Sequence, residues 1–327
     1  MGEIRVDPLS GLRVVFVPAR AGRPGAFPPL PPAVEIDPDG DPFAPGHEDR
    51  TPPERARAVA AGGGWSARAF ENRYPAFTPD APDPPREAAL DLFTSAGARG
   101  HHEVIVNAPR RVATLGALTR EELVLAMGLW RERMAAYAEA PHVHLHVSEG
   151  ADGGASQPHS HAQLWALDFV PAAVARERER CGAYATRTQG SDLLGDLVQA
   201  EVRLRERLVG YDDEAVMLAP YASRVPYQLM IVPRTPTPRF EAPGVLGAAL
   251  LHRALRALEA RFGAPPPLTL WVRTAPRGAE RFCWRIDVLP RLFAPGGLEL
   301  GTGVHLNPVL PERAAAELRP LATCSDS

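Results

Sequence analysis

The sequence predicts an α+β fold made of two tandem units, each an antiparallel sheet with helices packed on it. Apolar strands and helical segments alternate in the same order in both halves of the 327-residue chain. The strand sequence EVIVNAPR also aligns with YQLMIVPR when Pro109 is placed on Pro233, a shift of 233 − 109 = 124 residues. The same shift places the strand that starts near His161 on the strand that starts near Arg285. Because one shift relates two separate strands, we expect a duplicated unit.

The first unit begins with a long segment of coil. Residues 20–54 are dense in Pro, Gly and Asp, which favours coil over helix or strand. An apolar strand is expected at 102–109, followed by a helix that begins after Thr119. Glu122 lies three residues after that threonine, which is the pattern of a capping box. The strand HVHLHVS at 142–148 then leads into a glycine-rich loop.

The second unit repeats this order. A helix is expected from about Ser191, then strands within 215–234, then a helix at 245–262. The segments LTLWVR and FCWRIDVLPRL complete the unit as two further strands. We therefore predict one domain at 1–178 and a second domain at 179–327.

The composition excludes several classes of protein. Hydrophobic residues make up 45% of the chain and charged residues 23%, and the formal net charge is −3, so no basic field for nucleic acid is expected. The three cysteines, Cys181, Cys283 and Cys324, are far apart and form no CxxC pair. This spacing argues against a disulfide framework and favours the cytoplasm. No segment approaches 18 consecutive apolar residues, so we expect no membrane association.

The stretch SQPHSHAQLWA is the strongest functional signal in the chain. His159 and His161 are separated by one residue, and Gln163 follows at the same spacing, so the three side chains share one face of a strand. The pattern fits a metal site, a histidine nucleophile or a strand that is merely rich in histidine. The second unit has Cys283 and Arg285 at the matching positions, so the fold does not require the histidines.

A metal site is the weaker of the two functional interpretations. His142, His144 and His146 alternate on one strand face and, with the histidines of the motif, resemble a zinc cluster. However, no cysteine lies near them. Histidines on strands near a surface are more often solvated or hydrogen-bonded than bound to a metal.

A histidine nucleophile finds every group that it needs in this stretch. An imidazole nitrogen attacks phosphorus well if a backbone carbonyl holds the other ring nitrogen. Donors must also face the phosphoryl oxygens, where negative charge builds up. The loop 150–156 offers backbone N–H groups, among them that of Gly154, and the hydroxyl of Ser156. Gln163 offers an amide donor on the same strand face as His161.

The segment GASQPHSHAQLWA resembles the active-site motif of galactose-1-phosphate uridylyltransferases and their relatives in the histidine-triad superfamily. In that family the second histidine of the His-X-His-X-Gln motif carries the nucleotide during turnover. The resemblance therefore implies that His161 is nucleotidylated, that Gln163 assists it, and that His159 supports the loop. It also implies that each unit has a histidine-triad-like fold and that the protein is a homodimer.

Other segments resemble the same family in the expected order along nearly the whole chain. The likeness of PARAGRP, FENRYP and the start of the glycine loop to family segments implies further substrate-binding residues: Arg20, Arg23, Phe70, Asn72, Ser148, Gly154 and Ser156. Ser148 stands where the family has asparagine, so the covalent chemistry transfers more directly than the choice of base or sugar. The C-terminal segment that would contact the sugar matches the family only loosely.

The chain departs from the family at its metal ligands. The cysteines of the family's Cys-Pro-Phe-Cys segment are replaced by Asp41 and Ala44, and the third zinc position is Arg111. Of the four zinc ligands only His159 remains. Positions of a second metal site correspond approximately to three charged residues, Arg273, Arg285 and Asp287. We therefore expect no metal and no other cofactor.

Ion pairs are expected to take the place of the two metals. The sequence suggests that Asp41 pairs with Arg111, and that Asp287 pairs with Arg285 or Arg273. Such pairs orient loops, although a buried pair adds little net stability.

Three functional hypotheses follow from the resemblance. The leading one is a nucleotidylyltransferase that uses UDP-glucose and a hexose 1-phosphate as its partners. A second enzyme of the same chemistry would be a phosphorylase of ADP-glucose or of dinucleoside polyphosphates, with inorganic phosphate as acceptor, and a hydrolase would use water. From a different class, the chain would be a catalytically silent nucleotide-binding protein, which the lost metal ligands favour and the retained motif opposes.

Overall fold

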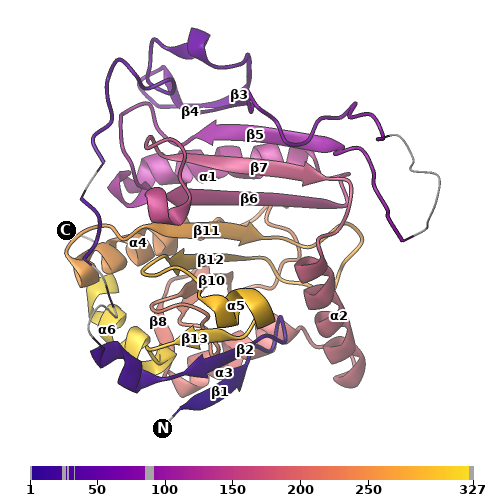
Figure 1. Ribbon diagram of the computed structural model, residues 1–327, viewed down its shortest axis with the longest axis vertical. Coiled ribbons are helices and arrows are strands. Elements are labelled where there is room, and N and C mark those ends of the chain that lie inside the picture. The colour runs from indigo at the N-terminus through magenta and orange to yellow at the C-terminus, as the bar shows by residue number, and fades with distance from the viewer. Residues whose placement is uncertain (1, 24–26, 28, 33, 85–91, 324–327) are drawn as a thin grey trace.

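The computed structural model describes residues 2–323 except 24–26, 28, 33 and 85–91. Within these residues one antiparallel sheet of ten strands runs through the molecule in the order β3-β4-β5-β7-β6-β11-β12-β10-β9-β8 (Figure 1). Its strands are β3 (Glu54–Val59), β4 (Trp65–Glu71), β5 (Gly100–Val106), β6 (His142–Glu149), β7 (His161–Leu167), β8 (Leu208–Tyr211), β9 (Ala215–Leu218), β10 (Leu229–Pro233), β11 (Leu268–Arg273) and β12 (Arg285–Pro290).

The described residues also form six α-helices and a small second sheet. The helices are α1 (Arg120–Ala136), α2 (Ala172–Arg187), α3 (Leu193–Leu204), α4 (Ala248–Phe262), α5 (Gly297–Thr302) and α6 (Pro311–Ala322). The small sheet has the order β1-β2-β13, with strands β1 (Glu3–Val6), β2 (Arg13–Phe16) and β13 (His305–Asn307). The predicted α+β class is confirmed.

The two predicted units contribute five strands each, and β6 and β11 join them edge to edge in antiparallel register. In the N-terminal half β5 lies next to β7, and in the C-terminal half β10 lies next to β12. Likewise β6 lies on the other side of β7 as β11 lies on the other side of β12. The shift of 124 residues therefore relates strands that hold corresponding places. The predicted boundary after residue 178 falls inside helix α2, and the division into two domains stays a prediction.

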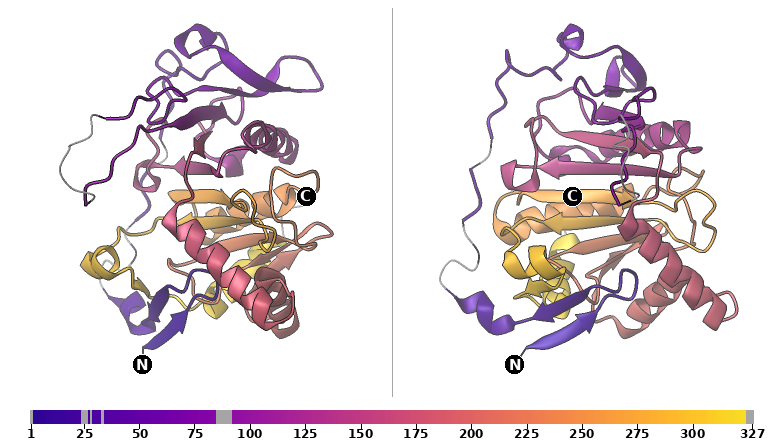
Figure 2. Two further views of the ribbon diagram at one scale, coloured as in Figure 1. Left: turned by 90° about the vertical axis from the view of Figure 1, so that its right-hand side faces the viewer. Right: turned by 45° about the vertical axis from the view of Figure 1, so that its right-hand side comes forward.

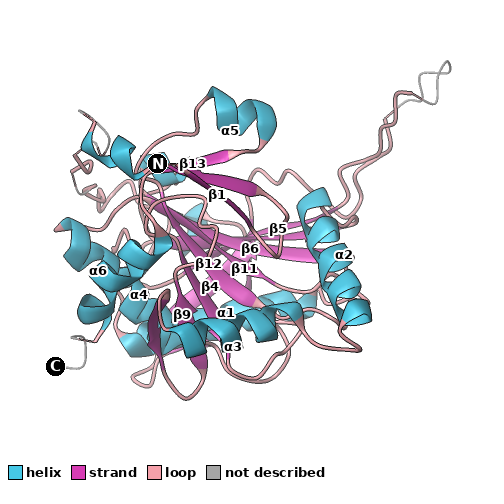
Figure 3. Cartoon of the chain, turned by 90° about the horizontal axis from the view of Figure 1, so that it is seen from below, coloured by secondary structure: helices cyan, strands magenta, loops and turns pink. Residues whose placement is uncertain are grey.

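Helices α1 and α4 pack on one face of the sheet (Figure 3), and their buried residues share one core with alternate strand residues. The capping box at the start of α1 is confirmed, because Thr119 accepts a hydrogen bond from the Glu122 N–H and the Glu122 carboxylate accepts one from the Thr119 N–H. The predicted helix at 245–262 and the strand LTLWVR are confirmed as α4 and β11. Helix α2 was not expected from the sequence.

Alternation along β7 positions the histidine motif. Ala162 and Leu164 point into the core beneath α1, so His161 and Gln163 point to the opposite face of the sheet. On this face His161 lies opposite Val106 of β5, and Gln163 lies between β5 and β6. The motif thus occupies the face of the N-terminal half-sheet that α1 does not cover.

The N-terminal hairpin lies far from the motif. Strand β2 pairs in parallel with β13, so the start of the chain packs beside its last part (Figure 2). This pairing holds the beginning of the chain against the C-terminal half of the molecule.

Cys181 and Cys283 are buried free thiols in a shared apolar cluster. Burial raises the pKa of each thiol to about 12, which keeps both protonated and unreactive near neutral pH. Cys324 lies outside the described residues. In the part of the chain that the structure describes, no helix has the length and apolar character needed to cross a membrane.

Candidate active site

A cavity of about 280 Å³ opens beside the histidine motif. Its walls come from four parts of the chain: the loop before β3, the end of β4, strand β5 and the motif itself. The described residues that line it are Pro42, Phe43, Arg50, Thr51, Pro52, Phe70, Asn72, Arg73, Tyr74, Val104, Ser156, Gln157, His161 and Gln163. The structure therefore brings together five of the predicted site residues: His161, Gln163, Phe70, Asn72 and Ser156.

His161 is oriented by the backbone of its own strand. Its Nδ1 donates to the carbonyl of His159 at 2.8 Å. Among the described residues no protein group bonds to Nε2, and the ring forms part of the cavity wall. Burial lowers the pKa of His161 below its ordinary value of 6.5, although the bond to the carbonyl opposes this. The ring is therefore a neutral imidazole near neutral pH, with Nε2 carrying its free lone pair.

Gln163 is held by a histidine that was not predicted as a site residue. His102 lies opposite Trp165 in β7 and stacks on its ring, with centroids 3.6 Å apart. Its Nδ1 faces the Ala76 N–H at 3.5 Å, which favours a proton on Nε2 that donates to the Gln163 carbonyl oxygen at 3.0 Å. The side-chain nitrogen of Asn72 lies 3.1 Å from the same Nε2. The bond from His102 leaves the amide N–H₂ of Gln163 free to donate to a ligand in the cavity.

Aromatic rings form the apolar side of the cavity. Phe43 packs edge-on against His161, with centroids 5.3 Å apart, and is tilted against Phe70 at 5.8 Å. Tyr74 adds a third ring, exposed on the outer wall. Asn72 accepts a hydrogen bond from the Tyr74 N–H and so fixes the turn that presents this ring. Such rings bind the faces of bases by stacking.

The glycine-rich loop separates into two parts. Gly150 and Gly154 have φ angles of 71° and 88°, a region that favours glycine. Ser156 reaches the cavity of His161, as predicted. Ser148 and Gly154 instead line a neighbouring cavity of about 390 Å³, next to His144 and His146. Among the described residues neither Ser148 nor Gly154 lines the cavity of His161, so their predicted contact with the same ligand stays a prediction.

Arg20 and Arg23 lie away from the cavity of their own chain, and their predicted contact with the phosphates stays a prediction. Both are exposed on the short helical turn Pro18–Gly22, and neither is among the described residues that line the cavity. The reason is the pairing of β2 with β13, which carries this turn to the C-terminal half. The cavity itself contains two other arginines, Arg50 and Arg73.

His159 does not line the cavity but lies behind it, fully buried. Its Nδ1 bonds to Asp41 Oδ2 at 2.7 Å and its Nε2 to the Ala108 carbonyl at 2.9 Å. The predicted partner of Asp41, Arg111, is exposed, so the predicted ion pair is wrong. A guanidinium at the surface can stay hydrated, whereas the buried carboxylate needs a buried partner.

These residues do not fit the zinc that the family resemblance implies. Both nitrogens of His159 already face oxygen acceptors, and Asp41 Oδ1 accepts from the Phe43 N–H at 2.9 Å. Ala44 carries no ligand atom, and the Arg111 guanidinium is a cation.

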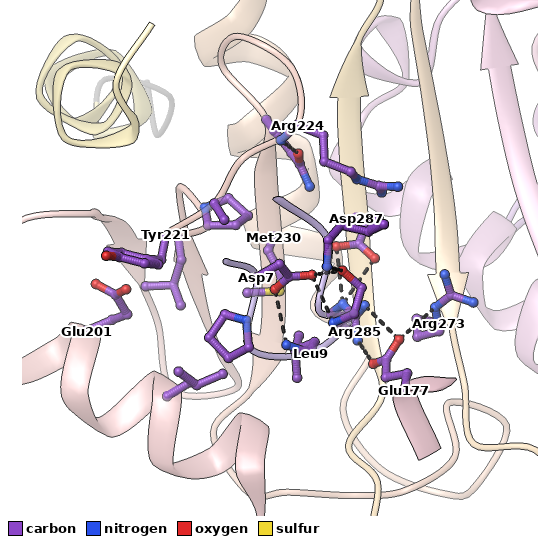
Figure 4. Close-up of a pocket in the computed structure, with 18 of the residues that line it drawn as sticks. Asp7, Leu9, Glu177, Glu201, Tyr221, Arg224, Met230, Arg273, Arg285 and Asp287 are labelled. Atoms are coloured by element: carbon purple, nitrogen blue, oxygen red, sulfur yellow. Dashed lines mark hydrogen bonds and ion pairs between the residues drawn. The ribbon is translucent and has the colours of Figure 1, made fainter. Parts of the chain in front are cut away.

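The second metal position is filled by an arginine (Figure 4). Arg285 lies between Asp287, whose Oδ2 is 3.0 Å from Nε, and Glu177, whose Oε2 is 3.2 Å from Nη2. Its Nη1 donates to the other oxygen of Glu177. The predicted pair of Arg285 with Asp287 is confirmed, whereas Glu177, from the unpredicted helix α2, was missed. Arg273 contributes a second cation, 3.5 Å from Glu177, so this set also does not fit a metal ion.

The three histidines of β6 form a stacked row and not a cage. Ring centroids are 6.4 Å apart between His142 and His144 and 5.5 Å apart between His144 and His146. Burial lowers the pKa of His142 and His146 to about 4 and that of His144 well below its ordinary value. Among the described residues no group of three or more His, Cys, Asp or Glu side chains is placed to hold a metal ion.

Several residues of the site were not predicted from the sequence. Phe43, Arg50, Arg73 and His102 reach the cavity or support it through contacts between distant segments. The sequence held a weak indication of His102, because this residue lies two positions before Val104 on the same strand face, and Val104 lines the cavity. The function of His102 depends on the pairing of β5 with β7, which local sequence does not reveal.

The fold and the site have close counterparts among known proteins. Residues 2–171 match the family described as galactose-1-phosphate uridyl transferase, N-terminal domain. ADP-glucose phosphorylase of Arabidopsis thaliana is 25% identical over 332 residues, which cover 98% of this chain and 93% of that protein. Galactose-1-phosphate uridylyltransferase of Haemophilus influenzae is 34% identical over 167 residues, 51% of this chain and 47% of that protein.

Two solved structures have the same fold as this chain. The crystal structure of the Arabidopsis thaliana ADP-glucose phosphorylase with bound ADP-glucose matches with a TM-score of 0.81 at 26% identity and covers 98% of both chains. A uridylyltransferase structure at 23% identity has the same fold, with a TM-score of 0.78 over 100% of both chains. The family match spans more than half of the chain and contains the complete histidine motif. The chain belongs to the galactose-1-phosphate uridylyltransferase family and is an enzyme of its nucleotidyltransferase type.

Proposed function

We propose that the protein transfers a nucleoside monophosphate from a nucleotide sugar to a phosphate acceptor through a covalent nucleotidyl-His161. The observation that carries this proposal is the bond from His161 Nδ1 to the His159 carbonyl. It fixes the tautomer, so the lone pair on Nε2 faces the cavity. Burial supports the same state, because it lowers the pKa of the ring and keeps the nucleophile neutral.

In the first half of the reaction, Nε2 attacks the α-phosphorus and the bond from that phosphorus to the sugar-phosphate oxygen breaks. Sugar 1-phosphate leaves, and a phosphoramidate bond joins the nucleotide to His161. The amide of Gln163 and the hydroxyl of Ser156 donate to the phosphoryl oxygens, where charge develops. In the second half, an oxygen of the acceptor attacks the same phosphorus and the Nε2–phosphorus bond breaks.

The cavity suits the nucleotide end of such a donor. The rings of Phe43, Phe70 and Tyr74 offer faces and edges for a base, and Arg50 and Arg73 offer positive charge for the diphosphate. We infer that these two arginines supply the charge that was expected from Arg20 and Arg23. If the latter pair contacts phosphate, it must do so in a second copy of the chain, which is consistent with the expected homodimer.

We favour ADP-glucose as donor and inorganic phosphate as acceptor. The likeness to the Arabidopsis thaliana ADP-glucose phosphorylase extends over nearly the full length of both chains, which supports this choice. UDP-glucose with a hexose 1-phosphate is the second candidate. The higher identity to the Haemophilus influenzae uridylyltransferase favours it, since that match covers the half of the chain that contains His161.

Intact-mass measurement tests the proposal. Protein incubated with ADP-glucose alone is expected to gain the mass of AMP, and the adduct should disappear when phosphate is added. A parallel incubation with UDP-glucose, then galactose 1-phosphate, reports on the second candidate. His161→Ala should form no adduct with either donor. If the wild type forms no adduct with any nucleotide sugar, or the variant still forms it, the proposed function is wrong.

A further inference from the structure

The strongest feature outside the cavity is the buried pair formed by Asp41 and His159. His159 is 0% exposed and Asp41 is 5% exposed. Asp41 Oδ2 and the Ala108 carbonyl, the partners of the two ring nitrogens, are both hydrogen-bond acceptors. A histidine donates from both nitrogens only as an imidazolium, so the geometry describes an ion pair with the Asp41 carboxylate.

This pair lies directly behind the nucleophile. The carbonyl that accepts from His161 Nδ1 is that of His159, so any rotation of residue 159 moves the acceptor that fixes the catalytic ring. The neighbouring backbone is also tied down, because the Ser160 N–H donates to the Val112 carbonyl at 2.7 Å and the Asn107 N–H to the Ser160 carbonyl at 3.1 Å. The Ser160 hydroxyl accepts a further bond from Asn107 Nδ2 at 3.0 Å, and the side chain of His159 anchors the turn through Asp41 and Ala108.

The same carboxylate also holds a wall of the cavity. Asp41 Oδ1 accepts from the Phe43 N–H at 2.9 Å, and the Phe43 ring packs against the edge of His161 at 5.3 Å. The Asp41 carbonyl accepts from His47 Nδ1 at 2.6 Å, which closes the loop around it. One side chain thus links the loop that carries Phe43 to the turn that carries His161, across 118 residues of sequence.

We propose that Asp41 is a positioning residue that takes over the role a structural zinc would have, by holding His159 and through it the Nδ1–H tautomer of His161. This inference rests on the proposed nucleotidyl-His161 chemistry. A metal at this point would hold the loop and the histidine together through shared ligands. The carboxylate does the same with one ion pair and one backbone hydrogen bond, and it needs no ligand from Ala44 or from the exposed Arg111.

Asp41→Asn tests the charge with little change of shape. It should lower the rate of adduct formation from ADP-glucose by about 10- to 100-fold, the usual effect of removing a partner that orients a reactive group. KM should change by less than about threefold, since Asp41 does not line the cavity and the oxygen of an asparagine can still accept from the Phe43 N–H. The matched control is Asp39→Asn, an exposed carboxylate on the same loop, which should stay within about twofold of the wild type.

Nitrogen NMR of histidine-labelled protein separates positioning from simple loss of structure. The wild type should show His161 protonated at Nδ1, and Asp41→Asn should show a mixture of tautomers while near-UV circular dichroism remains native. Dialysis of the wild type against EDTA should leave the rate unchanged. An Asp41→Asn protein with the wild-type rate and tautomer would overturn the proposal, as would loss of wild-type activity after chelation. Absence of any adduct in the wild type would instead refute the proposed function.

Discussion

Strands β7 and β12 hold corresponding places in the two halves of the sheet, yet their first residues do opposite things. His161 at the start of β7 keeps one ring nitrogen free and forms a wall of an open cavity. Arg285 at the start of β12 is 6% exposed and gives its donors to Glu177 and Asp287. Within the described residues, the first position leaves a ring nitrogen unbonded at its cavity, whereas the second lines a smaller cavity of about 100 Å³ with its donors already bound to carboxylates.

The shared fold therefore sets the positions of these side chains but not their chemistry. In the N-terminal half a histidine–carboxylate pair lies behind the strand and leaves the front of it accessible. In the C-terminal half helix α2 contributes Glu177, and the charges neutralise one another where the ligand would lie. In the part of the chain that the structure describes, the two halves of the sheet therefore differ in their polar groups: one leaves a histidine nitrogen unbonded at a cavity, and the other binds its arginine to two carboxylates.

Breaking the closed site should have the largest effect. Arg285→Met leaves Glu177 and Asp287 as buried carboxylates with less compensation, so the free energy of unfolding should fall by about 3–5 kcal/mol. Urea denaturation measures this change. Arg313→Met, which removes an exposed pair with Glu317, is the control and should lose less than about 1 kcal/mol. A loss for Arg285→Met as small as that of the control would show that the arginine is not needed to neutralise the network.

Substitutions in the cavity of His161 should instead lower the rate of the reaction. Gln163→Ala removes a donor to the phosphoryl oxygens, and kcat/KM should fall by about 100-fold with native stability. His102→Ala removes the hydrogen bond that holds the Gln163 amide. In a double-mutant cycle, the loss of kcat/KM in the double variant should therefore be smaller than the product of the two single losses. Gln199→Ala, exposed on α3, should behave as the wild type. Full additivity of the two cavity variants would contradict the coupling.

The pH dependence of the first half-reaction reports the protonation of His161. Protonation of His161 blocks the nucleophile, and burial places its pKa below 6.5. The rate of adduct formation should therefore be flat from pH 8 to pH 6.5 and should fall about tenfold per unit only at lower pH. Stopped-flow mixing with ADP-glucose measures this limb, and a limb centred above pH 7 would contradict the buried neutral ring.

The smallest effect on stability is expected at the start of helices α1 and α4, which hold corresponding places in the two halves. Helix α1 begins with the Thr119–Glu122 capping box, whereas α4 begins at Gly247, for which no side-chain cap is found among the described residues. Thr119→Ala should lower the free energy of unfolding by about 1 kcal/mol. Glu121→Ala, a neighbour in the first turn outside the box, should change it by a few tenths of a kcal/mol. Thermal unfolding of both variants checks whether the cap contributes.

Much of the fold could be predicted because its signals are local. The capping box, the strand LTLWVR and the spacing His-X-His-X-Gln each depend on neighbours within a few residues. Strand alternation alone placed His161 and Gln163 on one face. The predicted pairing of Asp287 with Arg285 or Arg273 came from the charged residues at the family's second metal site, and Arg285 lies two residues from Asp287 on one strand face.

The features that the sequence did not reveal concern partners that are distant in sequence. Asp41 was assigned to Arg111 by charge, yet it bonds to His159, 118 residues away. The pairing of β2 with β13 holds the turn of Arg20 and Arg23 at the other half of the molecule, and their contact with phosphate stays a prediction. The join of the two half-sheets through β6 and β11 had no signal in either strand.

The sequence alone indicated the repeated order of strands and helices and the shared strand face of His161 and Gln163, because strand period and helix capping act between near neighbours. The tertiary structure decided which charge neutralises which, which arginines reach the cavity and what holds the nucleophile in its tautomer. Those choices depend on which distant segments pack together and on how deeply each polar group is buried. A buried carboxylate must find a buried donor, and only the folded chain determines which donor is within reach.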